Sequence, residues 1–118
     1  MATILIADDD AFTRMRCAKL MTKSGHEVLE AVNGQEAVEK FRTHKPDCVL
    51  MDITMPEMDG LEALTEIRQI DPNARVAMVT AMSQQEIVIQ ALQAGAKDYV
   101  VKPFQSERVL RAVKKLLR

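Results

Sequence analysis

The chain has 118 residues, of which 47% are hydrophobic, and a formal net charge of -1 from 16 basic and 17 acidic residues. This length predicts one domain with a core of its own, and the balanced charge argues against nucleic-acid binding by bulk electrostatics. No apolar run approaches the ~20 residues of a membrane span, and acidic residues come too early for a signal peptide. We therefore expect a cytoplasmic protein whose two cysteines, Cys17 and Cys48, are free core thiols, since neither belongs to a CxxC or Cys/His cluster.

Short β-branched runs alternate with longer amphipathic stretches along the whole chain. Gly25 suits the end of the first helix, Asn33 suits the start of the second, and Ser83 with Glu86 matches a capping box at the start of the fourth. The short runs predict strands at about 3–7, 27–31, 47–52, 74–79 and 97–101. The amphipathic stretches predict helices at about 11–24, 34–43, 61–70, 84–94 and 106–117.

Five successive strand–helix units predict one parallel sheet with helices on both faces, which is a doubly wound α/β fold. The runs 49–51 and 76–79 are almost continuously apolar, as strands buried on both faces usually are. No GxGxxG follows the first strand, and no GxxxxGKS or GxxxxGKT occurs. The usual phosphate-binding loops of such folds are therefore not expected.

Three acidic residues lie where two of the predicted strands end. Asp8 and Asp9 follow the first strand, and Asp52 ends the third. The carboxyl ends of parallel strands share one edge of the sheet, where open α/β sheets bind ligands, so these carboxylates should lie together. Like charges held this close repel one another, and Mg²⁺ binds both carboxylates and phosphate oxygens. The cluster predicts a phosphoryl-handling Mg²⁺ site; the alternative is that the acids cap the first and third helices.

Two further polar residues follow strands that end at the same edge. Lys102 comes after the fifth strand, where its ammonium could pair with Asp52 or with a phosphoryl oxygen. Pro103 keeps Lys102 in an extended backbone conformation and raises the chance of a cis bond. Thr80 ends the fourth strand, and its hydroxyl could donate to a phosphoryl oxygen. Taken alone, Lys102 would more ordinarily be a solvated lysine at a strand end, and Thr80 would be a turn or cap hydroxyl.

Taken together, these residues resemble the response-regulator receiver domain family, and the resemblance covers essentially the whole chain, residues 1–118. The chain is most similar to the single-domain, CheY-like chemotaxis type. One such motif alone would be weak, but five in order at the expected strand ends are specific. The motifs are Ile4-Leu5-Ile6-Ala7-Asp8-Asp9, Met51-Asp52-Ile53-Thr54-Met55-Pro56 with Asp59-Gly60, Val79-Thr80-Ala81, Gly95-Ala96 and Lys102-Pro103-Phe104.

The resemblance implies a fold and a metal site. The fold would be the flavodoxin-like, CheY-like sheet with strand order 2-1-3-4-5. Asp52 would be the phosphoacceptor that attacks a phosphohistidine on a sensor histidine kinase or phosphotransfer protein. Mg²⁺ would be bound by Asp9, Asp52 and the main-chain carbonyl of Thr54, and Asp8 would reach it through water.

The resemblance also implies a signalling switch rather than an enzyme that transforms a metabolite. Thr80 and Lys102 would bind the phosphoryl group, and Tyr99 would be the rotameric switch, turning inward as Thr80 moves toward the phosphate. The output protein would bind the face formed by the helix at 84–94, the strand at 97–101 and the helix at 106–117. The expected state is a monomer or a weak, phosphorylation-dependent dimer, with no direct contact to nucleic acid or membrane.

Three alternatives remain open. The chain could be the receiver domain of a longer, DNA-binding response regulator, or a degenerate receiver that is never phosphorylated. It could also be a small Mg²⁺-dependent phosphatase with an aspartyl nucleophile, because Asp8-Asp9-Asp10 resembles the DxD pattern of haloacid-dehalogenase-like enzymes. Phe12 stands where that pattern needs Thr or Val. Phe12 and Met15 could instead form an exposed pair that docks the kinase, or could cover a neighbouring helix.

Overall fold

The computed structural model covers residues 1–118, and its elements alternate in the predicted order. Every predicted strand and helix is present, with ends that differ by a few residues at most. The strands are β1 (Thr3–Ala7), β2 (Glu27–Ala31), β3 (Cys48–Met51), β4 (Val76–Thr80) and β5 (Asp98–Val101). The helices are α1 (Ala11–Lys23), α2 (Gly34–His44), α3 (Gly60–Ile70), α4 (Gln85–Gln93) and α5 (Ser106–Leu116).

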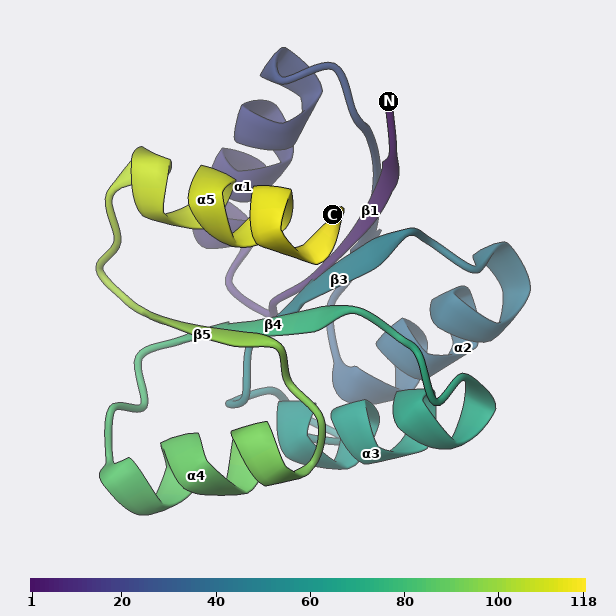
Figure 1. Cartoon of the computed structure of the whole chain (residues 1–118), viewed down its shortest axis with the longest axis vertical. Coiled ribbons are helices and arrows are strands. Elements are labelled where there is room, and N and C mark those ends of the chain that lie inside the picture. Colours follow the sequence, from purple (N-terminus) through teal and green to yellow (C-terminus); the bar gives the residue numbers. More distant parts are fainter.

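The five strands form one parallel sheet in the order β2-β1-β3-β4-β5, which confirms the predicted topology. Helices α1 and α5 cover one face, and α2, α3 and α4 cover the other (Figure 1). The chain runs outward from β1 to β2 and then returns to the other side of β1 with β3. The carboxyl ends of β1 and β3 are thus neighbours at the point where the strand order reverses, which is where such sheets bind ligands.

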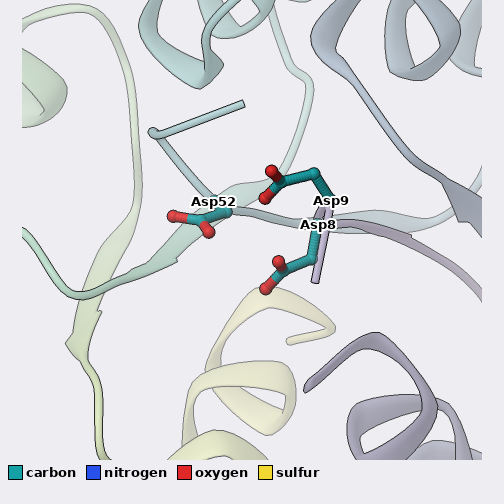
Figure 2. A group of neighbouring side chains, drawn as sticks. All are labelled: Asp8, Asp9 and Asp52. Carbon is teal, nitrogen blue, oxygen red and sulfur yellow. The ribbon is translucent and has the colours of Figure 1, made fainter. Parts of the chain in front are cut away.

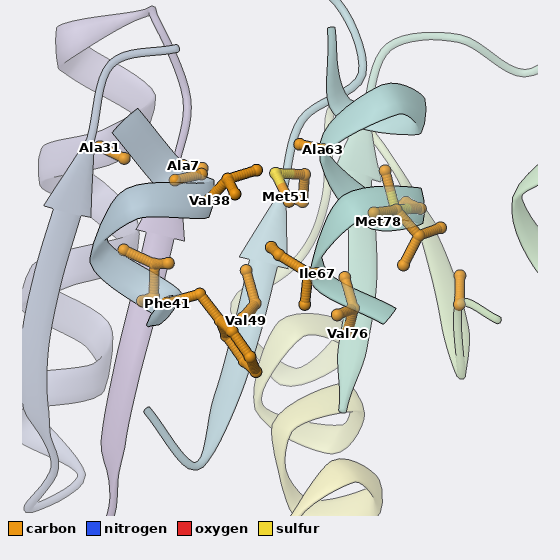
Figure 3. Packing of buried hydrophobic residues seen from close by; sticks show 14 of the residues in the cluster. Ala7, Ala31, Val38, Phe41, Val49, Met51, Ala63, Ile67, Val76 and Met78 are labelled. Carbon is orange, nitrogen blue, oxygen red and sulfur yellow. The ribbon is translucent and has the colours of Figure 1, made fainter. Parts of the chain in front are cut away.

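Alternate residues of the strands supply two separate cores, one under each helical layer. Along β1, Leu5 faces α2 and α3, whereas Ile4 and Ile6 face α1 and α5. Both faces of the central strands are therefore apolar, which explains their nearly continuous hydrophobic sequence. Figure 3 shows the larger core, in which β-strand residues Val49, Met51, Val76 and Met78 pack against Val38, Phe41, Ala63 and Ile67 of α2 and α3.

Both cysteines are free and buried in the α1/α5 core, as predicted. Burial raises the pKa of the Cys17 thiol to about 11 and that of the Cys48 thiol to about 12. Both groups are therefore neutral thiols at physiological pH and behave as small apolar side chains.

Side chains cap three of the helices at their N-termini. Asp10 accepts a hydrogen bond from Thr13 N on α1, Asn33 caps α2 as predicted, and Asp59 accepts from Glu62 N on α3. The acids that cap α1 and α3 are thus different from Asp8, Asp9 and Asp52. The capping alternative for that trio is therefore wrong, because Asp10 and Asp59 are the caps of these helices.

The predicted capping box at Ser83 and Glu86 is wrong. Helix α4 begins at Gln85, its cap is Gln84, and no side chain bonds the free N–H groups there. The preceding loop is held instead by a tertiary contact, in which the Tyr99 hydroxyl donates to the Met82 carbonyl at 2.6 Å. The loop before α4 is thus held by a contact with β5 and not by a side-chain cap, so tertiary structure overrides the local signal here. No helix in the structure has the length and apolar character to cross a bilayer.

Candidate functional site

The three predicted acids meet at the carboxyl ends of β1 and β3. Asp8 and Asp9 follow β1, Asp52 follows β3, and the neighbouring strand residues Ala7 and Met51 are paired in the sheet. One carboxylate oxygen from each acid lies within 4.8 Å of the others. Figure 2 shows these carboxyl groups gathered beside one another. Asp8 and Asp52 are buried at 4% and 6% exposure, whereas Asp9 is open to solvent.

The Asp52 carboxyl group is held by the main chain that follows it. Its Oδ1 accepts hydrogen bonds from Ile53 N at 2.7 Å and from Thr54 N at 3.4 Å. Its own N–H donates to the Ala7 carbonyl at 2.9 Å and so continues the β1–β3 pairing. With Oδ1 occupied in this way, Oδ2 is the oxygen that faces the rest of the site.

A glycine at the start of α3 allows this arrangement. The Gly60 N–H donates to the Ile53 carbonyl at 2.8 Å. A Cβ at this position would lie 1.9 Å from the Asp52 carbonyl oxygen, so any larger residue would displace the backbone that carries the carboxylate. The pair Asp59-Gly60 therefore supplies two separate functions, a helix cap and room for the site backbone.

Lys102 joins the two buried carboxylates. Its Nζ lies 2.7 Å from Asp8 Oδ2 and 3.0 Å from Asp52 Oδ2. The main chain of Lys102 is held at the end of β4, because its N–H donates to the Thr80 carbonyl at 2.8 Å. The peptide bond between Lys102 and Pro103 is cis. The predicted approach of Lys102 to the acid cluster is thus present in the structure.

Burial works against the charges of both partners in this cluster. It raises the pKa of the Asp8 carboxyl, and the hydrogen bond and charge of Lys102 offset only part of that effect. Burial alone would lower the pKa of Lys102, but its bonds to Asp8 and Asp52 outweigh burial and raise it. One ammonium shared by two buried carboxylates leaves the site short of positive charge.

The donor set at this edge suits a hard divalent cation. Carboxylate oxygens are the ligands that Mg²⁺ prefers, and the close group formed by Asp8, Asp9 and Asp52 supplies them together. The shortage of positive charge would also be relieved by a cation. The residues present therefore fit a magnesium ion by their chemistry.

The turn that carries Asp8 and Asp9 is anchored by residues that the sequence analysis missed. Arg14 of α1 donates from Nη1 to the Asp8 carbonyl at 2.7 Å and from Nε to Glu30 on β2 at 3.0 Å. The Asp8 side chain in turn accepts from Asp10 N at 2.9 Å. An arginine six residues after Asp8 was visible in the sequence, but its reach back across the turn depends on α1 packing beside β2.

The two predicted threonines differ in their surroundings. Thr80 is fully buried at the end of β4, and its Oγ1 accepts a hydrogen bond from Met82 N at 3.4 Å. Thr54 lies exposed in the β3–α3 loop, two residues after Asp52. Thr80 thus lies on the same sheet edge as the acids, and Thr54 follows Asp52 closely in the chain.

Tyr99 on β5 is half-buried and is turned toward the β4–α4 loop. Its hydroxyl donates to the Met82 carbonyl, two residues beyond Thr80. Burial raises the pKa of the Tyr99 hydroxyl, and the negative charge of Asp52 raises it further. The phenol is therefore a neutral hydrogen-bond donor at physiological pH.

Two apolar side chains of α1 are exposed close to the site. Phe12 is 68% exposed and Met15 is 47% exposed. The expected exposed pair is thus present, and the alternative that both cover a neighbouring helix is wrong. Leu110 of α5 and Leu117, which follows that helix, are half-buried at the margin of the core.

Comparison with known proteins assigns the chain to a family. Residues 4–114 match the model of the response regulator receiver domain. The chain is 60% identical to the chemotaxis protein CheY of Bacillus subtilis, over 97% of this chain and 96% of that protein. It is 56% identical to the chemotaxis protein CheY of Thermotoga maritima, over 96% of this chain and 95% of that protein.

Among solved structures, the CheX-CheY-BeF3-Mg+2 complex from Borrelia burgdorferi contains a chain with the same fold. The TM-score is 0.94, with 38% sequence identity over 98% of this chain and 89% of that one. The three-dimensional comparison therefore agrees with the observed fold. The chain belongs to the response regulator receiver domain family and is a receiver of the CheY type, a two-component signalling switch.

Proposed function

We propose that Asp52 accepts a phosphoryl group from a phosphohistidine on a sensor histidine kinase or phosphotransfer protein. The observation that carries this proposal is the geometry around Asp52, where Oδ1 is fixed by main-chain N–H groups and Oδ2 faces the ammonium of Lys102. A carboxylate held in one orientation beside a cation is prepared for nucleophilic attack on an anionic group.

In the transfer step, an Asp52 carboxylate oxygen forms a bond to phosphorus while the phosphorus–nitrogen bond of the donor breaks. The imidazole leaves with the bonding electron pair and takes up a proton. The product is an acyl phosphate on Asp52. Water later attacks the same phosphorus, the bond from phosphorus to the carboxyl oxygen breaks, and inorganic phosphate leaves as the carboxylate is regenerated. Such transfers depend mainly on positioning and on neutralising charge at the phosphoryl oxygens.

Lys102 and Thr80 would supply the positioning contacts. Lys102 already lies 3.0 Å from Asp52 Oδ2, where the phosphoryl group would be attached. The Thr80 hydroxyl lies on the same sheet edge and would donate to a phosphoryl oxygen. These two residues act on the transferred group without forming bonds to phosphorus themselves.

A magnesium ion would be held by Asp9, Asp52 and the main-chain carbonyl of Thr54, with Asp8 reaching it through water. When bound, Mg²⁺ would neutralise charge on the carboxylates and the phosphoryl oxygens. The gathered carboxylates and the shortage of positive charge support this proposal. The relative from Borrelia burgdorferi, whose structure includes BeF3 and Mg+2, supports it as well.

Phosphorylation would be transmitted to the face formed by α4, β5 and α5. Thr80 would move toward the phosphoryl group and Tyr99 would turn inward, which changes the surface that an output protein meets. Three apolar side chains on this face are partly open to solvent, namely Ile89 at 45%, Leu92 at 48% and Val101 at 41% exposure. The same face would support a weak, phosphorylation-dependent dimer, and Phe12 with Met15 would contact the phosphoryl donor.

The aspartyl phosphatase alternative loses its main support. It rested on the run Asp8-Asp9-Asp10, which the match to the receiver family now explains. In the structure Asp10 caps α1 through Thr13 and so takes no part in the acid cluster. We therefore assign turnover only to the protein's own acyl phosphate.

The test is incubation of the wild type with Mg²⁺ and acetyl phosphate, followed by intact mass spectrometry. We expect the mass to increase by one phosphoryl group. When the metal is chelated before the donor is added, we expect no increase. The matched variant is Asp52→Asn, which keeps the side-chain shape but removes the nucleophile. Equal labelling of the variant would refute the assignment of Asp52. Continuous release of phosphate from an unrelated aryl phosphate would favour the phosphatase instead.

A further inference from the structure

Tyr99 lies on the open edge of the sheet. Strand β5 pairs only with β4, so its other edge has no strand partner. The Lys102 N–H donates to Thr80 on β4, and successive residues of a strand direct their main-chain groups to opposite edges. Tyr99, three residues before Lys102, therefore directs its N–H and C=O to the open edge.

Two side chains occupy that edge at Tyr99. The Tyr99 N–H donates to Asp98 Oδ1 at 2.8 Å, and Arg108 Nη2 of α5 donates to the Tyr99 carbonyl at 3.1 Å. Both main-chain groups of the tyrosine are thus bonded, as a neighbouring strand would bond them.

The same two side chains are bonded to each other. Arg108 Nη1 lies 3.0 Å from Asp98 Oδ2, and Nη2 lies 2.9 Å from Oδ1, which is a bidentate pair. The pair links the first turn of α5 to the first residue of β5. A planar guanidinium fits this role, because it can bond a carboxylate with two N–H groups and still reach a carbonyl.

These bonds extend a chain of contacts that begins at the candidate phosphoryl site. Thr80 Oγ1 accepts from Met82 N, and the Met82 carbonyl accepts from the Tyr99 hydroxyl. From Tyr99 the chain continues through its main-chain carbonyl to Arg108 on α5. The side chain of Tyr99 therefore contacts the β4–α4 loop, while its backbone contacts α5.

We propose that Asp98 and Arg108 are positioning residues for Tyr99, which fix its backbone at the sheet edge and couple its side-chain rotation to α5. This inference rests on the proposed function, because it concerns how the phosphorylated site acts on the output face. Tyr99 bonds the Met82 carbonyl through its hydroxyl and Arg108 of α5 through its main-chain carbonyl, so a change at Met82 can reach α5 through this one residue. Figure 1 shows β5 at the margin of the sheet between α4 and α5, where such a connection is needed.

The test is a comparison of amide chemical shifts before and after Mg²⁺ and beryllofluoride are added. Residues 8–10 report that the site is occupied, and residues 106–116 of α5 report the response. The variants are Arg108→Lys, which keeps the charge but loses the planar fork, and Asp98→Asn, which keeps the shape but loses the charge. The control is Arg111→Ala, which removes an exposed arginine from the same helix.

We expect all the proteins to show the same shifts at residues 8–10. In Arg108→Lys and Asp98→Asn the response of α5 should fall about threefold to tenfold, as the loss of charge-assisted hydrogen bonds predicts. Arg111→Ala should respond like the wild type. Adding Arg108→Lys to Tyr99→Phe should cause no further loss, because both changes interrupt the same connection.

Two results would overturn the inference. One is an α5 response in Arg108→Lys and Asp98→Asn equal to that of Arg111→Ala, since a purely structural pair would give this outcome. The other is an additive loss in the double variant, which would place Arg108 outside the path through Tyr99. If the wild type shows no shift at residues 8–10, the proposed function fails first, and the coupling fails with it.

Discussion

Strand β5 carries an ion-paired cluster at each end, and the two clusters are built in opposite ways. At its start, Asp98 and Arg108 form a one-to-one bidentate pair. Beyond its end, a single ammonium on Lys102 is shared by Asp8 and Asp52. The first cluster is balanced in charge, whereas the second has one buried carboxylate more than it has cations.

The pKa values of Asp98 and Asp8, one carboxyl group from each cluster, are shifted in opposite directions. Burial alone would raise the pKa of Asp98, but the hydrogen bonds from Arg108 and the Tyr99 N–H, together with the charge of Arg108, outweigh burial and lower it. The hydrogen bond to Asp98 raises the pKa of Arg108. Folding thus favours the charged form of both members of that pair. At Asp8 burial prevails and the pKa is raised, so folding disfavours the charge. The balanced pair stabilises the fold, whereas the buried charge of Asp8 lowers the free energy of unfolding.

The largest expected effect comes from removing the shared ammonium. Lys102→Ala should lower the free energy of unfolding by about 3 kcal/mol at neutral pH, because Asp8 and Asp52 would stay buried without a cationic partner. Urea unfolding followed by circular dichroism measures this loss. The control is Lys97→Ala, which removes an exposed lysine directly before β5. An effect of Lys102→Ala no larger than that of the control would show that the carboxylates do not depend on Lys102.

A smaller effect is expected at the balanced pair. Asp98→Asn should lower the free energy of unfolding by about 1 kcal/mol at neutral pH, because neutral amide bonds replace charge-assisted ones. The folded pKa of Asp98 lies below its ordinary value of 3.8, so its contribution is complete above that value and is lost as the pH falls through the folded pKa. The difference between wild type and variant should therefore shrink in acid. A constant difference from neutral to acidic pH would contradict the ion pair.

The fold could be predicted from the sequence because the hydrophobic periodicity, the helix-end residues and the alternation of strands with helices all indicate the same structure. β-Branched runs of the right length marked the strands, and Gly25 and Asn33 marked two helix ends correctly. Parallel topology then brought Asp8, Asp9 and Asp52 to one edge without any further information. Lys102 followed from the same argument, because it ends a strand of the same sheet.

The remaining features depend on tertiary contacts that no local pattern encodes. Ser83 and Glu86 match a capping box, but α4 begins only at Gln85, and the loop before it is held by the contact between Tyr99 and Met82. Asp98 and Arg108 are ten residues apart and meet only because α5 folds back over β5. In related chains the signal to look for would be an aspartate directly before the tyrosine at the Tyr99 position, together with an arginine in the helix that follows.

The contrast between the two clusters is tested most directly by the stability of Asp8→Asn with and without magnesium. Because folding raises the pKa of Asp8, the charged carboxylate begins to cost stability as the pH rises through its ordinary value of 3.8, and the cost grows until the pH passes the folded pKa. In a chelating buffer at neutral pH, Asp8→Asn should therefore have a free energy of unfolding about 1 kcal/mol higher than the wild type, and so unfold at a higher temperature.

In saturating Mg²⁺ the order should reverse. The wild type gains about 2.7 kcal/mol when the free ion is at a hundred times its dissociation constant, whereas the variant has lost part of the site and gains less. Thermal unfolding of both proteins in chelator and in Mg²⁺ gives the four values needed. Higher stability of Asp8→Asn in chelator and of the wild type in Mg²⁺ is the predicted result. If the variant is less stable than the wild type under both conditions, the claim that the buried charge of Asp8 lowers stability in the absence of a cation is contradicted.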